Sequence, residues 1–176
     1  MTDATIATDR LLLRKPTASD VTPIMDVHQD PEVMRFLGPY PVNITTAWKN
    51  VAMMVGHWEM LGYGSWVVLD KSTGEMVGRV GLWYPDGWLG VELGWTVRRS
   101  RWGQGIATEA SRAALKWAWA NVQVDHIISM IHPENVASIR IAEKLGEKFE
   151  RSEVLNGSEV LVYGIDRSRA AGEETD

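Results

Sequence analysis

Residues 91–108 read VELGWTVRRSRWGQGIAT, and this stretch decides which class of fold the chain can adopt. Apolar side chains at positions 91, 93, 95 and 97 alternate with Glu, Gly and Thr, which is the period-2 pattern of a strand with two different faces. A glycine-containing loop follows at 99–105, and from Ile106 the apolar residues recur at helical spacing. Small loop residues and the positive end of the helix dipole would together favour a phosphate at this strand–loop–helix junction.

Two well-known phosphate-binding motifs do not fit this loop. A Walker A loop needs Gly-Lys-Ser/Thr, which does not follow Gly105, and the dinucleotide fingerprint G-x-G-x-x-G is also absent. Arg98, Arg99 and Arg101 lie close together in a net acidic chain and favour an anion nearby. Two alternatives stay open, because any tight strand–helix turn can use two glycines and the arginines can be a solvated strand end.

Outward toward the N-terminus, the pattern predicts helices and then a meander of strands. A strand is expected at 10–15, a helix from the capping pair Thr17 and Asp20 through His28, and further helices at about 30–37 and 45–61, with a loop at 38–41. Strands at 63–70, 75–84 and 88–98 are separated by short turns. Sequential strands joined by tight turns predict antiparallel pairing.

Toward the C-terminus, the character changes to alternating helices and strands. A helix is expected at 106–121, an apolar and therefore central strand at 124–131, and a helix from 133–135 to about Gly146. A hairpin of 147–152 and 159–166 would turn at Asn156-Gly157. Residues 1–166 are thus predicted to form one α/β (α+β) domain, and 167–176 a disordered tail.

Composition excludes several classes of protein. The 176 residues suit one domain, and the lack of cysteine excludes disulfides and thiolate nucleophiles. The four histidines lack metal-site spacing, so no metal is expected. No signal peptide and no apolar run of about 20 residues is present, which predicts a cytoplasmic protein without membrane partners. A net charge of −5 disfavours nucleic acid and favours a cationic substrate.

Three blocks of the sequence resemble one family. Val91–Val97 with Trp102–Ala110 resembles the acetyl-CoA-binding motif of GNAT N-acetyltransferases, Q/R-x-x-G-x-G/A, and covers Trp102 to Ala107. Trp102 departs from the usual Gln or Arg, and an aromatic there is similar to the RimJ/RimL branch of ribosomal-protein acetyltransferases. The block from Asn135 to Gly146 resembles the family's later helix, and the blocks at 8–14 and 30–34 resemble the N-terminal half of the branch.

The resemblance implies a mixed, mostly antiparallel sheet flanked by helices, with acetyl-CoA as co-substrate. Backbone groups of one strand would bind the pantetheine arm where two parallel strands separate, and loop amides would cradle the pyrophosphate. The later helix would contact the cofactor, and an arginine near position 99 would meet a phosphate on the adenosine side. The implied cofactor-binding residues are Trp95, Thr96, Val97, Arg99, Trp102, Gly103, Gln104, Gly105, Ile106, Ala107, Thr108 and Asn135.

Two residues are candidates for catalysis. Glu92 lies on the cofactor strand, on the face opposite Val91, Leu93 and Trp95, and is the candidate base, although it could be an exposed strand glutamate. Many relatives use a tyrosine as the acid, but the corresponding position here is Ala142. In the RimL-like branch the proposed donor is a serine, which corresponds to Ser138; that hydroxyl could instead bond its own helix backbone.

The function implied by the resemblance is transfer of acetyl from acetyl-CoA to a primary amine through a ternary complex. The acceptor stays open between a protein N-terminus and a small amine. The alternative is a catalytically silent acyl-CoA sensor with the same fold. Dimers are common in such folds, so a homodimer is a further expectation.

Overall fold

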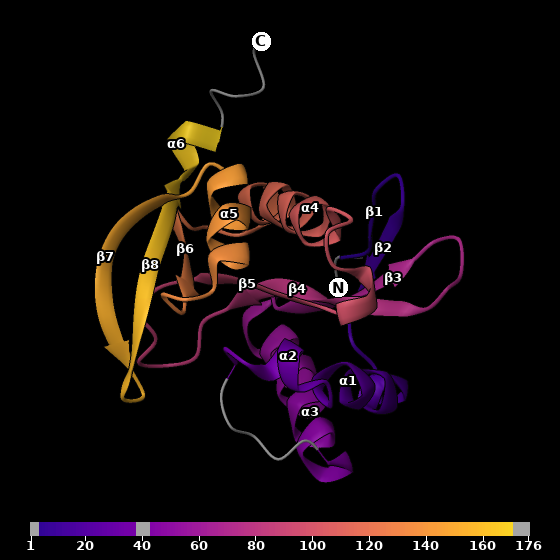
Figure 1. Cartoon of the computed structure of the whole chain (residues 1–176). Helices are drawn as coiled ribbons and strands as arrows, with labels where there is room; N and C mark the ends of the chain where they lie inside the picture. The colour runs from indigo at the N-terminus through magenta and orange to yellow at the C-terminus, as the bar shows by residue number, and fades with distance from the viewer. Residues whose placement is uncertain (1–3, 38–42, 171–176) are drawn as a thin grey trace.

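The computed structural model describes residues 4–37 and 43–170, and the strands among them form one eight-stranded sheet in the order β1-β2-β3-β4-β5-β6-β8-β7 (Figure 1). Every neighbouring pair is antiparallel except β5 and β6, which are parallel. The strands are β1 (Ile6–Ala7), β2 (Leu11–Arg14), β3 (Ser65–Asp70), β4 (Met76–Trp83), β5 (Glu92–Val97), β6 (His126–Ile131), β7 (Lys148–Leu155) and β8 (Ser158–Asp166).

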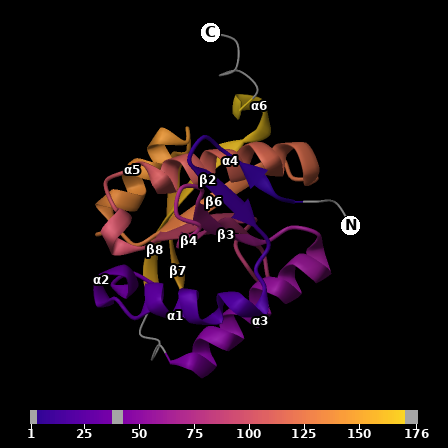
Figure 2. The ribbon, with the colours of Figure 1, turned by 90° about the vertical axis from the view of Figure 1, so that its right-hand side faces the viewer.

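Helices cover both faces of this sheet. In Figures 1 and 2, α4 and α5 lie over one face and α1 to α3 over the other. The helices are η1 (Ala18–Asp20), α1 (Val21–His28), α2 (Pro31–Met34), α3 (Ile44–Leu61), η2 (Arg99–Arg101), α4 (Ile106–Asn121), α5 (Val136–Lys144) and α6 (Arg167–Ala170). The fold class predicted from the sequence is therefore confirmed.

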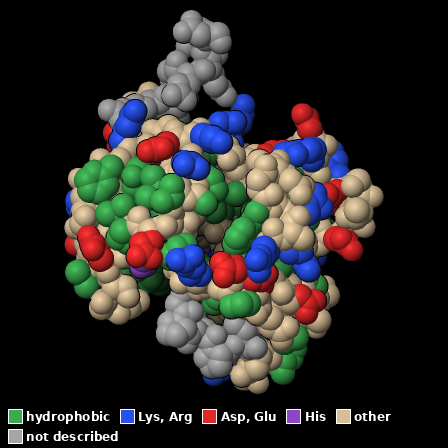
Figure 3. Space-filling model, in the orientation of Figure 1, with side chains coloured by type: hydrophobic (Ala, Val, Ile, Leu, Met, Phe, Trp, Pro, Cys, Tyr) green, Lys and Arg blue, Asp and Glu red, His purple; other side chains and the backbone are tan. Residues whose placement is uncertain are grey.

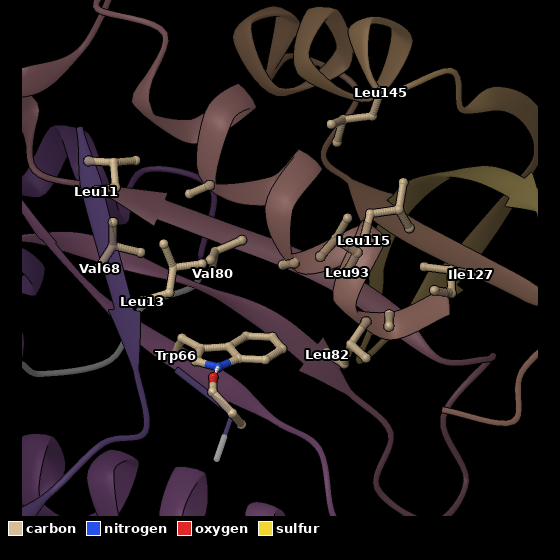
Figure 4. Packing of buried hydrophobic residues seen from close by; sticks show 14 of the residues in the cluster. Leu11, Leu13, Trp66, Val68, Val80, Leu82, Leu93, Leu115, Ile127 and Leu145 are labelled. Carbon is tan, nitrogen blue, oxygen red and sulfur yellow. Dashed lines mark hydrogen bonds between the residues drawn. The ribbon is translucent and has the colours of Figure 1, made fainter. Parts of the chain in front are cut away.

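The main core lies between the sheet and α4 (Figure 4). Ala110, Ala114 and Ala118 recur every four residues along α4 and are at most 1% exposed, so their small side chains let the helix lie close to the strands. Leu82, Leu93 and other strand residues fill the opposite side of this core. A smaller cluster, which includes Ile24 of α1 and Val51 of α3, packs against the other face of the sheet.

Local signals in the sequence placed most elements correctly. Thr17 and Asp20 form the predicted capping box, although it closes a single 3-10 turn before α1. Asn156 and Gly157 both have positive φ, 52° and 83°, as a tight hairpin turn requires. Strand β1 was not predicted, because two residues are too short to show a period.

The segment from 167 begins differently from the predicted tail. Residues 167–170 form α6, and the Arg167 guanidinium donates to the carbonyl oxygens of Trp119, Val122 and Val124. The predicted loop at 38–41 and the rest of the tail, 171–176, lie outside the described residues.

Candidate functional site

The parallel strands β5 and β6 meet at one point and then separate. Glu92 pairs in register with Ile128, and the Ile128 amide donates to the Val91 carbonyl at 2.9 Å. Beyond this point no further pair is in register, so the two strands form a fork that opens toward Val97. The backbone edge of β5 inside the fork is free to bond a ligand.

The antiparallel pairing with β4 shows which groups face the fork. The Arg98 amide donates to the Val77 carbonyl, and bonded pairs alternate along an antiparallel ladder. Trp95 and Val97 therefore turn their backbone groups toward the fork, whereas those of Thr96 point to β4. The Val97 carbonyl already has a partner within the protein, because the Trp102 indole N–H donates to it at 2.7 Å.

The loop after β5 leads into an uncapped helix end. Gly103 and Gly105 have φ of +73° and +76°, a backbone conformation that side chains disfavour, and an added Cβ at Gly103 would meet nothing within 4 Å. No side chain within residues 4–37 and 43–170 caps α4. The amides of its first turn, which include those of Ile106, Ala107 and Thr108, therefore keep their hydrogens for a ligand. This cradle without side chains fits a phosphate.

Polar side chains hold this loop in place. Arg10 donates to the Gln104 carbonyl at 3.0 Å and forms an ion pair with Glu109 of α4. Arg101, one of the three clustered arginines, bonds Asp70 and the Gln104 side chain. These two arginines therefore shape the loop. Arg10 was not predicted as a site residue, because its partner Glu109 is 99 positions away.

Arg99 remains the candidate to bind a phosphate on the adenosine side of the cofactor. Its guanidinium lies 3.7 Å from the Asp30 carboxylate, and the side chain is 58% exposed. A long and exposed pair of this kind contributes little and leaves the arginine able to bind an anion.

A cavity of about 690 Å³ lies between the N-terminal helices and the fork. Its lining brings together Glu92, Trp95, Asn135 and Ser138, four of the predicted site residues, whereas Arg99 and the loop 102–108 lie outside it. The space-filling view is hollowed near the middle of the face seen in Figure 1 (Figure 3).

Glu92 enters the cavity from the face of the sheet covered by α1 and α3. The Trp88 indole N–H donates to its carboxylate at 2.8 Å. Burial raises the pKa of Glu92, while the bond from Trp88 and the positive charge of Arg79 oppose the rise. Burial therefore makes this carboxylate a stronger proton acceptor than one in water.

Asn135 and Ser138 enter the cavity from the opposite side, at the start of α5. The Asn135 Oδ1 accepts the Ser138 backbone amide at 3.1 Å and so caps the helix. The Ser138 Oγ accepts the Trp95 indole N–H at 3.3 Å. Because the hydroxyl acts as an acceptor in that bond, its own hydrogen remains available to a third group.

Glu147 is a buried acid that the sequence analysis missed. It is 2% exposed, and burial raises the pKa of its carboxyl to about 8, so it holds a proton at neutral pH. Ser129 of β6 bonds both Glu147 and the Leu93 carbonyl of β5. Glu147 is thus linked through Ser129 to the end of the fork where β5 and β6 meet. The sequence signal was an acidic residue directly after Gly146, which ends the block 135–146.

Two absences concern only the part of the chain that the structure describes. Within residues 4–37 and 43–170, no helix is both long and apolar enough to cross a bilayer. Over the same residues, no group of three or more His, Asp or Glu side chains could hold a metal ion.

Comparisons with known proteins identify the family. The sequence profile of the acetyltransferase (GNAT) domain matches residues 10–148. YkkB of Bacillus subtilis is 32% identical over 157 residues, which cover 84% of this chain and 87% of YkkB. An acetyltransferase structure from Agrobacterium tumefaciens has a TM-score of 0.83 at 26% identity, and covers 94% of this chain and 95% of its own.

The ribosomal α-N-protein acetyltransferase RimL, solved in complex with coenzyme A, shares the fold. Its TM-score is 0.79 at 19% identity, over 92% of this chain and 97% of RimL. The fork, the uncapped glycine loop and the profile match over most of the length agree: the chain belongs to the GNAT family of acetyltransferases.

Proposed function

We propose that the protein transfers acetyl from acetyl-CoA to a primary amine in a ternary complex. The observation that carries this proposal is the cavity, in which a half-buried carboxylate and a helix-borne hydroxyl reach the same strand fork from opposite faces of the sheet. Acetyl-CoA is the donor that the family and the coenzyme A complex of RimL suggest.

The chain's backbone would hold the donor. The first-turn amides of α4 bind the pyrophosphate, and the free amide and carbonyl groups of Trp95 and the Val97 amide bond the pantetheine arm inside the fork. One of these strand amides also donates to the thioester oxygen as negative charge develops on it. Asn135 bonds the arm through its side-chain N–H groups, since its Oδ1 caps the helix.

Glu92 acts as the proton acceptor and Ser138 as the proton donor of the reaction. Glu92 removes a proton from the ammonium group, through water, and leaves a neutral amine. The amine nitrogen attacks the thioester carbon and forms the C–N bond, and it then loses its second proton to water. The C–S bond breaks, and sulfur leaves with the electron pair. Ser138 donates a proton to that sulfur and regains one from solvent. A thiolate is a fair leaving group by itself, so the hydroxyl assists the reaction without being essential.

Release of free CoA in the presence of acetyl-CoA and a panel of amines and N-terminal peptides tests this function. We expect thiol release that depends on the amine. Glu92→Gln should lower the rate by about 10²-fold at low pH and by less at high pH, where more amine is already neutral.

The matched control is Glu159→Gln, an exposed acid on β8, which should leave the pH profile unchanged. An equally small loss for Glu92→Gln at every pH would remove Glu92 from the role of base. Tight acetyl-CoA binding without thiol release for any amine would favour the silent sensor.

A further inference from the structure

The floor of the cavity is a strip of sheet with a cation at one end and an acid at the other. Gly81 of β4 pairs with Gly94 of β5, and side chains alternate along each strand, so Arg79 and Glu92 point to the same face as these glycines. All four residues line the cavity. A Cβ at Gly94 would meet only the Glu92 carboxylate, at 3.9 Å, so the space above Gly94 is open, whereas a Cβ at Gly81 would collide with the backbone of Ser65.

Arg79 has no ion-paired carboxylate within residues 4–37 and 43–170, although the charge of Glu92 acts on it from a distance. Among the described residues it makes no hydrogen bond or ion pair, whereas the partly buried Arg14 and Arg101 each have a carboxylate, Asp20 and Asp70. Burial lowers the pKa of Arg79 and the charge of Glu92 opposes that change, but a guanidinium stays charged at any physiological pH. A cation held in a cavity without a paired anion is costly unless a ligand supplies one.

The groups around Arg79 do not neutralise it. The charge of Arg79 acts on His28 of α1, and burial together with that charge lowers the pKa of His28 to about 4, so it is neutral. The Glu92 carboxylate already accepts the Trp88 N–H. Lys49 of α3 adds a second cation to the lining, so two cations face one carboxylate even though the whole chain is acidic.

The rest of the lining is mainly apolar. Trp83 and Trp88, Met53 and Met54, and Phe36 border the same space. A volume of about 690 Å³ is within the range of small-molecule sites. Aromatic and thioether walls suit an acceptor with an apolar body between its charged groups.

We propose that the acceptor is a small primary amine that also carries an anionic oxyacid group, and that Arg79 determines this specificity. The planar guanidinium matches a carboxylate or a phosphate with two parallel hydrogen bonds. The amine then lies over the glycine strip next to Glu92, with its anion at Arg79. This inference rests on the proposed acetyl transfer and names its substrate class, and it reverses the cationic substrate that the net charge favoured.

Matched acceptors test this class. Aromatic and aliphatic amino acids are each compared with their amides and decarboxylated amines, together with amines that carry a phosphate and with peptides of four or more residues. The measurement is kcat/KM from free CoA release. We expect the anionic member of a pair to exceed the neutral one by roughly 10- to 100-fold, the usual effect of a hydrogen-bonded charge. The carboxylate and phosphate arms show which oxyacid fits better.

Variants then assign the preference to Arg79. Arg79→Gln should bring the ratio of anionic to neutral acceptor close to one, mainly through KM, and Arg79→Lys should keep part of it. The affinity for acetyl-CoA should stay unchanged, and the melting temperature should not fall, because the substitution removes an unpaired charge from the cavity. Arg151→Gln, which removes an arginine from the exposed hairpin, is the control and should keep the full preference.

The outcomes separate this inference from the proposed function. Amine-dependent release with equal kcat/KM for charged and neutral acceptors would overturn the inference alone, as would peptides that outperform every small acid. A large loss of acetyl-CoA affinity in Arg79→Gln would assign the arginine to the donor instead. If no amine of any class supports release, the proposed function fails and this inference fails with it. If Arg79→Gln does not fold, the matched acceptors assayed with the wild-type enzyme and with Arg79→Lys still test the inference.

Discussion

Two helices begin at the edges of the same fork, and their N-termini are built in opposite ways. The N-cap residue of α4 is Gly105, which has φ of +76° and offers no side-chain cap. The N-cap residue of α5 is Asn135, whose side chain accepts the Ser138 amide at 3.1 Å. The first end keeps its amides for a ligand, whereas the second satisfies an amide internally and presents side chains to the cavity.

The difference teaches how one fold can separate binding from chemistry. At the start of α4 the important property is that the glycine loop has no side-chain atoms, because these would keep the backbone amides from approaching a pyrophosphate closely. At α5 the important property is the placement of one hydroxyl, which the cap and the Trp95 indole both help to position. Substitutions at the N-terminus of α4 should therefore change the affinity for acetyl-CoA, whereas substitution of the hydroxyl at the N-terminus of α5 should change the rate of the reaction.

The largest effect is expected at the uncapped N-terminus of α4. Gly105→Val places a branched side chain where the phosphate approaches, and we expect the Kd for acetyl-CoA to rise by about 100-fold or more, since several hydrogen bonds to a charged group are lost. Gly157→Val is the control, because Gly157 also has positive φ, +83°, in the distant β7–β8 turn. Calorimetric titration of both folded variants measures the effect. Wild-type affinity in Gly105→Val would place the phosphate elsewhere.

A smaller effect is expected for the Ser138 hydroxyl at the capped N-terminus of α5. Ser138→Ala should lower kcat by roughly 10- to 100-fold, the low end of general-acid help, because a thiolate also leaves unaided. Acetyl-CoA affinity should hold, and stability should change little, since Asn135 provides the cap. Ser152→Ala on the exposed face of β7 is the control. A full-rate Ser138→Ala enzyme would leave water or unassisted departure of the thiolate.

The smallest effect is expected for the cap itself. Asn135→Ala should cost about 1 kcal/mol of stability, or a fall in Tm of about 2–4 °C for a domain of this size. Asn43→Ala provides the matched control, because Asn43 caps α3 by the same bond, to the Thr46 amide, and does not line the cavity. Equal Tm losses, with acetyl-CoA affinity lowered only in Asn135→Ala, would show that Asn135 both caps α5 and binds the donor. Unchanged stability in Asn135→Ala would contradict the cap.

The sequence alone determined the elements and the glycine loop. The boundaries of α4 followed from the glycines before Ile106 and the alanine spacing within the helix, and the turn at Asn156-Gly157 followed from two residues that tolerate positive φ. These signals are local: a turn residue or a helical period acts within a few positions of itself. For the same reason, local pattern was enough to place Asn135 and Ser138 at the start of a helix.

Only the tertiary structure decided what those elements do together. The fork depends on Glu92 meeting Ile128, and the cavity floor depends on β4 lying beside β5, so neither can be seen in a local pattern. The sequence left open whether Ser138 caps its helix or faces the cavity, and the fold decides it because Asn135 takes the cap. Arg79 and Glu147 gained their importance from burial, which long-range packing sets, because a charge costs little in water and much inside a protein.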